Sequence, residues 1–284
     1  MWRRRVGRDT PQGLFVGLAT VDVIQRVDEL PRPNAKVTAM RQDVAGGGPA
    51  LNAAATFAAL GGVAVLAAPV GDGPLGHLIR DDLRRCAVEL IDLASHGFEP
   101  PVSAITVDAH TGDRQIVSYD GSGYPDVVPT ISADGFDVVL LDGHGPAAAR
   151  SALTAAVAAG VPTVLDAGRW RPVFADLLPR ATHVICSADF IAPEPISGPR
   201  TVAVSDGAGP IRYVTDGVAG TAPVPSVAVI DTLGAGDVLH GAFAAAIARG
   251  AAVPEALHSA AGHASDKCRH PGVREWLDTV RRTR

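Results

Sequence analysis

Asp231-Thr232-Leu233-Gly234-Ala235-Gly236-Asp237 is the most informative segment of this 284-residue chain. An apolar run, 224–230, precedes it, and an Ala-rich segment that predicts a helix, 238–249, follows it. A Gly-Ala-Gly turn that opens a helix points several backbone N–H groups at one place, and the helix N-terminus adds partial positive charge there. The segment therefore predicts an anion site, most naturally for a phosphate group.

Asp237 lies at the mouth of the same turn. A carboxylate beside a phosphate site repels the phosphate unless it takes part in the chemistry. The obvious chemistry is to accept a proton from a hydroxyl group that attacks the phosphate. Asp is also a favoured N-cap residue of helices, so this segment alone supports a purely structural role about equally well.

Composition and charge narrow the class of protein. Hydrophobic residues make up 47% and aromatic residues only 5%, which favours Ala-rich helices packed on Val-rich strands. The net charge of −5 gives no sign of a nucleic-acid partner, and no apolar run is long enough to span a membrane. Cys86, Cys186 and Cys268 are far apart and lack metal-binding spacing, which predicts reduced thiols in a cytoplasmic protein.

Apolar runs alternate with helical segments along most of the chain. This order predicts an α/β fold with a mostly parallel central sheet covered by helices on both faces. Residues 1–12 are predicted to be a disordered tail before a single domain, 13–284. Strands are expected at 14–19, 36–44, 63–70, 88–93, 102–108, 114–119, 138–141, 162–166, 183–186, 201–204 and 211–214, and helices at 53–60, 75–86, 146–159, 172–178, 238–249, 254–268 and 272–281.

Several polar residues stand where a ligand would bind. Asp22 follows the first predicted strand, and ligands of parallel sheets gather at the carboxyl ends of strands. Three glycines, 46–48, precede a helix that carries Asn52, and such a turn lets the backbone approach a ligand. A capping role for Asp22 and a merely flexible turn at the glycines remain open. Side chains that could contact a charged ligand are Arg41, Arg114 and Arg169, with Lys36 a weaker candidate. His144, which follows a strand end, could line the ligand pocket.

Gly47-Gly48-Pro49-Ala50-Leu51-Asn52 and the segment 231–237 together resemble the two motifs of the ribokinase/PfkB family of carbohydrate kinases, with features of its ketohexokinase-like branch. The motifs lie ~180 residues apart on an α/β pattern, which is more specific than either motif alone. The resemblance spans about 14–277. It implies a three-layer α/β/α ribokinase-like fold with a small β lid formed from about 23–44 and 100–120.

The resemblance also implies an activity, namely transfer of the γ-phosphoryl group of ATP, with Mg²⁺, to a hydroxyl of a sugar or sugar derivative. The implied enzyme is a cytoplasmic homodimer that pairs through its lid. Asp237 would be the general base, and the backbone of Gly234, Ala235 and Gly236 the anion hole. The implied acceptor-binding residues are Asp22, Gly47, Gly48 and Asn52, and the implied nucleotide-binding residues are Ser187, Ser205, Gly207, Gly209 and Lys267. Asp231 falls where some members bind K⁺.

The chain departs from the family pattern in three places. The usual Asn-x-x-Glu, which helps to organise Mg²⁺, is replaced by Ser187-Ala188-Asp189-Phe190. The usual Thr-x-Gly-x-x-Gly of the nucleotide pocket appears as Ser205-Asp206-Gly207-Ala208-Gly209-Pro210, and an expected Asn is Thr20. These departures leave the nucleotide preference open and weaken a specific assignment to ribose.

Two other functions remain open at this stage. A nucleoside kinase of the same fold would want aromatic walls, and the lid region offers only Phe98, Tyr119 and Tyr124. A catalytically weak sugar or nucleotide sensor is suggested by the altered segment 187–190, whereas the intact segment 231–237 argues against it. The chain has no Gly-x-x-x-x-Gly-Lys-Ser/Thr, which excludes a P-loop kinase.

Overall fold

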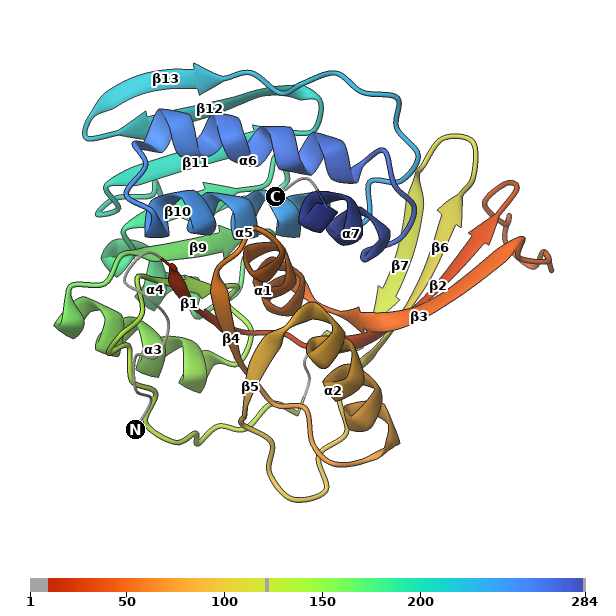
Figure 1. The fold of residues 1–284 in the computed structure, drawn as a ribbon, viewed down its shortest axis with the longest axis horizontal. Helices are drawn as coiled ribbons and strands as arrows, with labels where there is room; N and C mark the ends of the chain where they lie inside the picture. The colour runs from red at the N-terminus through yellow and green to blue at the C-terminus, as the bar shows by residue number, and fades with distance from the viewer. Residues whose placement is uncertain (1–9, 121–122, 283–284) are drawn as a thin grey trace.

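A nine-stranded sheet forms the middle layer of the molecule (Figure 1). The computed structural model describes residues 10–120 and 123–282. Across the sheet the order is β13 (Val218–Ala222), β12 (Gly209–Thr215), β11 (Thr201–Asp206), β10 (His183–Cys186), β9 (Thr163–Ala167), β8 (Val138–Leu141), β1 (Gln12–Val16), β4 (Val63–Ala68) and β5 (Val88–Asp92). From β11 to β5 all neighbouring strands pair in parallel, whereas β12 pairs antiparallel with both β11 and β13.

Helices cover both faces of this sheet because its central strands are apolar on both faces. In β8, Val138 and Leu140 join one hydrophobic cluster, and Val139 and Leu141 join the other, as the two-residue period of a strand requires. On the first face lie α1 (Pro49–Ala59), α2 (Pro74–Cys86), α5 (Ala235–Ala248), α6 (Val253–Lys267) and α7 (Glu275–Arg282). On the second face lie α3 (Pro146–Ala159) and α4 (Phe174–Leu177), followed by a 3₁₀ turn, Leu178–Arg180.

A smaller sheet projects from one side of the body (Figure 1). Its strand order is β3 (Arg41–Gly47), β2 (Thr20–Val27), β6 (Val102–Asp108) and β7 (Arg114–Ser118), and only β2 and β6 are parallel. Three of its apolar side chains, from Ile24, Ile105 and Val107, pack against Leu233 and Val273 of the body. This sheet is the lid, and its inner face is anchored directly on the segment 231–237.

Most of the predicted elements are confirmed, and so is the mostly parallel central sheet with helices on both faces. Strands 138–141 and 183–186 and helix 146–159 have the predicted bounds. Four helices begin with a proline at their first or second position, where a missing N–H costs nothing. Helix α1 accordingly starts at Pro49, four residues before the predicted Ala53.

Several elements differ from the prediction. The first strand ends at Val16, so Asp22 lies within lid strand β2 and not at the carboxyl end of a body strand. The lid strand expected at 36–44 begins only at Arg41. Two strands, β2 and β13, were not among those predicted. Residues 1–9 of the predicted tail lie outside the described residues, and Gln12, placed in that tail, opens β1.

No helix within residues 10–120 and 123–282 is long and apolar enough to cross a membrane.

Candidate active site

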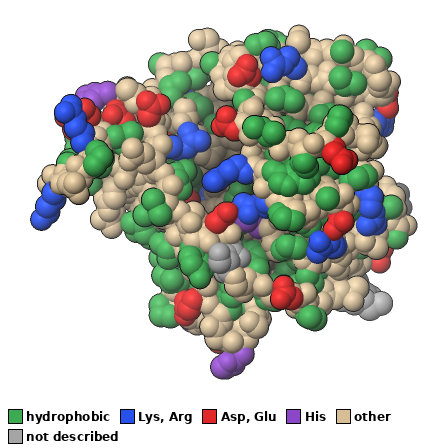
Figure 2. All heavy atoms as spheres, turned by 180° about the vertical axis from the view of Figure 1, so that it is seen from behind, with side chains coloured by type: hydrophobic (Ala, Val, Ile, Leu, Met, Phe, Trp, Pro, Cys, Tyr) green, Lys and Arg blue, Asp and Glu red, His purple; other side chains and the backbone are tan. Residues whose placement is uncertain are grey.

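A cavity of about 440 Å³ lies between the lid and the body. Figure 2 shows the hollow between them, with basic and acidic side chains gathered around it. Its walls come from lid strands β2, β6 and β7, from the start of α1, from the segments that follow β8, β9 and β10, and from the start of α5. The carboxyl ends of central parallel strands therefore face this cavity, where ligands of such sheets bind.

Asp237 reaches this cavity from the first turn of α5. The N-cap of α5 is Gly234, which has a φ of 75° and no capping side chain, so the structure does not use Asp237 as the N-cap. Oδ2 of Asp237 instead accepts a hydrogen bond of 2.7 Å from Nδ2 of Asn52. Burial raises the pKa of Asp237, because a desolvated carboxylate is costly, and the Asn52 bond opposes this shift.

Two of the three residues of the Gly-Ala-Gly turn line the cavity. Gly234 and Gly236 line it, and within the described chain their backbone amides have no hydrogen-bond acceptor. Ala235 does not line the cavity, and its amide donates to the carbonyl oxygen of Thr232 at 3.2 Å. The amides at the start of α5 that remain available to an anion are therefore those of Gly234 and Gly236, next to the Asp237 carboxylate.

Asn52 is held between Asp237 and a residue that the sequence analysis missed. Its Oδ1 accepts a hydrogen bond of 2.9 Å from Nη1 of Arg274, so its NH₂ group must face Asp237. Arg274 is fixed in turn by Asp82, with an Nη2–Oδ2 distance of 2.8 Å, and by the carbonyl oxygen of Gly46 at 2.7 Å. Asn52 lines the cavity, and its amide also orients the carboxylate of Asp237.

Asp22 faces the same cavity from the lid. It is 5% exposed and accepts a hydrogen bond of 2.6 Å from Oγ1 of Thr20. Burial raises its pKa, and the bond from Thr20 opposes the shift. Gly47 pairs with Thr20 in the neighbouring strand, and a Cβ atom there would lie 2.0 Å from Oδ2 of Asp22. Gly47 therefore makes room for Asp22, whereas Gly48 lines the cavity itself with a φ of 94°.

A second group of charges lies after β8. Oδ2 of Asp142 accepts the backbone amides of Leu18 and Ala50 at 2.8 and 3.1 Å. Nε2 of His144 lies 3.0 Å from Oδ1 of Asp120, and its Nδ1 lies 3.1 Å from Oδ1 of Asp142. Burial disfavours the charged imidazole, but the two carboxylates outweigh it and raise the pKa of His144 to about 9. His144 lines the cavity, as expected.

The predicted nucleotide-binding residues are only partly brought together. Ser187 lines the cavity, and its Oγ donates to the carbonyl oxygen of Gly168 at 2.7 Å. Ser205 lies one strand further, where its Oγ donates to the carbonyl oxygen of Cys186 at 3.2 Å. Gly207 lies in the turn between β11 and β12, and Gly209 is the first residue of β12. Neither these glycines nor Ser205 line the cavity.

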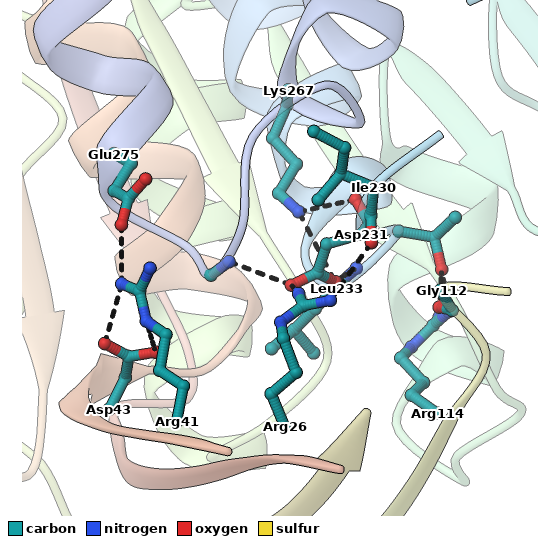
Figure 3. Close-up of polar contacts among 12 residues, drawn as sticks. Arg26, Arg41, Asp43, Gly112, Arg114, Ile230, Asp231, Leu233, Lys267 and Glu275 are labelled. Carbon is teal, nitrogen blue, oxygen red and sulfur yellow. Dashed lines mark hydrogen bonds and ion pairs between the residues drawn. The ribbon is translucent and has the colours of Figure 1, made fainter. Parts of the chain in front are cut away.

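Lys267 and Asp231 contact each other in the interior, away from the cavity (Figure 3). Lys267, predicted to bind the nucleotide, is fully buried and does not line the cavity. Its Nζ donates to the carbonyl oxygen of Asp231 at 2.8 Å. The Asp231 carboxylate, predicted to bind a monovalent cation, is 0% exposed and pairs with Arg26 at 2.8 Å.

The donor set for Mg²⁺ is sparse but suitable. The part of the chain that the structure describes holds no group of three or more His, Cys, Asp or Glu side chains able to cage a metal. Mg²⁺ is usually held by one or two carboxylates together with substrate phosphates. Asp166 and Asp189 line the cavity and can supply these carboxylates. Asp166 lies on β9, which pairs with β10 just before Ser187, and Asp189 follows Ser187 in the sequence. Burial raises the pKa of Asp166 to about 6, a shift that a bound cation would reverse.

Comparisons with known proteins agree on one family. The chain is 26% identical over 300 residues to a ribokinase of Arabidopsis thaliana. This match covers 92% of the chain and 76% of the ribokinase. A solved structure from Agrobacterium tumefaciens, provisionally described as a ribokinase, has a TM-score of 0.83 and 27% identity over 96% of this chain and 98% of that one. The Arabidopsis thaliana ribokinase complexed with ribose and ATP has a TM-score of 0.74 at 21% identity, over 95% and 98% of the two chains, and shows the shared fold.

The family model described as "pfkB family carbohydrate kinase" matches residues 12–280, which include both motifs and every side chain of the cavity. The chain therefore belongs to the pfkB family of carbohydrate kinases.

Proposed function

We propose that this kinase transfers the γ-phosphoryl group of ATP to a hydroxyl of a sugar or sugar derivative bound beneath the lid. The observation that carries this proposal is the position of the Asp237 carboxylate. It is a partly buried base held by Asn52, it faces the cavity, and it adjoins the open amides of Gly234 and Gly236. A base and an anion hole at one point are what phosphoryl transfer to a hydroxyl needs.

Each group has a distinct task in this proposal. Asp237 accepts the proton of the attacking hydroxyl, and the amides of Gly234 and Gly236 stabilise charge on the transferred phosphoryl group. Asp22 accepts hydrogen bonds from other hydroxyls of the acceptor and so orients it. Mg²⁺ bound by Asp166 and Asp189 would neutralise charge on the phosphates of ATP. ATP as the donor is supported by the Arabidopsis thaliana ribokinase structure, which holds ATP.

A sugar fits the cavity better than a nucleoside does. The described residues that line it include no Phe, Tyr or Trp on which a base could stack. They do include Asp22, Ser103 and Asn52, which exchange hydrogen bonds with hydroxyl groups. His144, Arg114 and Arg169 also line it, so a negatively charged sugar derivative belongs in any test. A specific branch of the family, including the ketohexokinase-like one, stays a prediction.

A coupled ADP-release assay tests the function. Purified protein with ATP and Mg²⁺ would be offered ketohexoses, pentoses, sugar phosphates, sulfosugars, keto-deoxy acids and nucleosides. We expect acceptor-dependent ADP release with at least one sugar or sugar derivative, and none with nucleosides. Release with nucleosides alone would favour a nucleoside kinase. ATP binding by thermal shift, without ADP release from any acceptor, would favour a sensor.

We also propose that two copies pair through the lid. Every residue of outer strand β7 is exposed, and the exposed fraction of Val117 is 76%. Apolar side chains on an open sheet mark a surface that another chain covers. We expect a dimer of the wild-type chain by light scattering, and a monomer for Val117→Asp. Val218→Asp, on β13 and 67% exposed, is the matched control and should leave the molar mass unchanged. A wild-type monomer at every concentration would contradict the proposal.

We place this activity in the cytoplasm, where Cys86, Cys186 and Cys268, all free thiols in the structure, would remain reduced.

A further inference from the structure

The carboxylate of Asp231 is saturated by groups of the chain itself (Figure 3). Its Oδ1 accepts the amide of Leu233 at 2.8 Å. Its Oδ2 accepts the amide of Gly272 and Nη2 of Arg26, both at 2.8 Å. Nζ of Lys267 lies 3.7 Å from Oδ1. Both Asp231 and Lys267 are 0% exposed, so this carboxylate and this ammonium group have no contact with bulk water.

The main-chain oxygens beside this carboxylate are engaged in the same way. Nζ of Lys267 donates to the carbonyl oxygen of Asp231 at 2.8 Å, and Nη1 of Arg26 donates to that of Ile230 at 3.3 Å. A bound K⁺ would need several such oxygens as ligands. Here the oxygens that an ion would use already accept hydrogen bonds from an ammonium and a guanidinium group.

The positive charges around Asp231 also disfavour a bound cation. Two cationic side chains, Arg26 and Lys267, surround one buried carboxylate, so a third cation would be repelled. Burial lowers the pKa of Lys267, and the Asp231 carboxylate opposes this shift. Removing the ammonium would leave the buried carboxylate with less compensating charge, which a protein interior tolerates poorly.

We propose that the Lys267 ammonium, supported by Arg26, is a built-in substitute for a monovalent cation beneath the anion-binding turn, so that this kinase does not depend on K⁺. Lys267 is supplied by the last residue of α6, and Arg26 by lid strand β2. Together with the amides of Leu233 and Gly272 they fix the backbone just before Gly234. The geometry of the anion hole is thereby set by side chains of the chain and not by a bound ion.

The wild-type protein provides the first test, which needs no acceptor and stands even if the proposed function fails. Its melting temperature would be measured in potassium, sodium and choline chloride at equal ionic strength. We expect the same melting temperature in all three salts, because nothing specific binds at Asp231. A melting temperature that rises by a few degrees in potassium alone would overturn the proposal, since a ligand of the native state stabilises it.

Two variants provide the second test. Lys267→Ala removes the ammonium and leaves space beside the oxygens of Asp231, so it should melt lower in choline and recover part of the loss in potassium or ammonium salts. Lys36→Ala changes the other lysine of the chain, which is exposed, and should behave like the wild type in every salt. A Lys267→Ala protein as stable as the wild type in choline, or one that no cation restores, would overturn the proposal. If that variant does not fold, the wild-type comparison decides alone.

The catalytic part of the inference rests on the proposed function. Once an acceptor is known, kcat/KM of the wild type should be the same in potassium and choline, whereas Lys267→Ala should become potassium-activated. The wild type could release no ADP with any acceptor and yet have the same melting temperature in potassium as in choline. That result would count against the proposed function and support the built-in cation. Potassium-dependent turnover of the wild type would overturn the built-in cation and leave the kinase intact.

Discussion

Asp237→Asn is expected to lower kcat by roughly 10²–10⁴-fold, the usual contribution of a general base. The amide has nearly the shape of the carboxylate but cannot accept the proton of the attacking hydroxyl. Binding of the acceptor and of ATP should persist, because Asp22 and the amides at the start of α5 are unchanged. The measurement is steady-state ADP release together with ligand-induced thermal shifts, and Asp134→Asn, an exposed loop residue, is the control.

The same experiment has a pH dimension. The base works only when deprotonated, and burial raises the pKa of Asp237 above its ordinary value. Activity of the wild type should therefore fall as the pH drops through an acidic limb, whose midpoint lies above that of an ordinary Asp. The residual activity of Asp237→Asn should lack this limb. Turnover retained at the wild-type level in Asp237→Asn would show that another group is the base.

Arg274→Met is expected to lower the free energy of unfolding by about 3–5 kcal/mol, as measured when one partner of a buried ion pair is removed. The substitution leaves the Asp82 carboxylate, whose side chain is 7% exposed, without its guanidinium. It also frees the carbonyl oxygen of Gly46 and the amide of Asn52, so Asn52 would no longer be locked toward Asp237. A fall in kcat should therefore accompany the loss of stability.

Denaturant unfolding would measure this loss, with Arg212→Met, a change at an exposed residue of β12, as the matched control. Adding Asp82→Leu to Arg274→Met should restore part of the stability, since the unpaired carboxylate is then gone. It should not restore kcat, because Asn52 remains without its anchor. A change in unfolding free energy as small as that of Arg212→Met would contradict the role given to the ion pair.

Local patterns account for what the sequence could predict. The segment 231–237 and the glycines 46–48 are short motifs whose chemistry is set by backbone geometry, and apolar runs such as 138–141 are long enough to mark buried strands. The lid was harder. Asp22 was expected at the end of a body strand, because nothing local separates β1 from β2 except the three residues 17–19.

Contacts between residues distant in sequence could not be predicted. Arg274 reaches Asn52 across 222 positions, and nothing in its own neighbourhood distinguishes it from other arginines of the chain. Lys267 was expected to face a nucleotide because it lies in a basic turn. The fold instead points it inward toward Asp231, 36 positions earlier. Which way a long cationic side chain points is decided by the carboxylate that the tertiary structure places beside it.

The space beside Gly47 has a genetic consequence. No missense change at this codon can avoid adding a Cβ atom, because glycine alone among the amino acids lacks one. That atom would fall 2.0 Å from the Asp22 carboxylate, whatever chemistry the new side chain carries beyond it. In a library with every amino acid at position 47, we therefore expect only glycine to be tolerated, with alanine lost along with every larger residue. The cause of that loss would be the Asp22 carboxylate on the neighbouring lid strand.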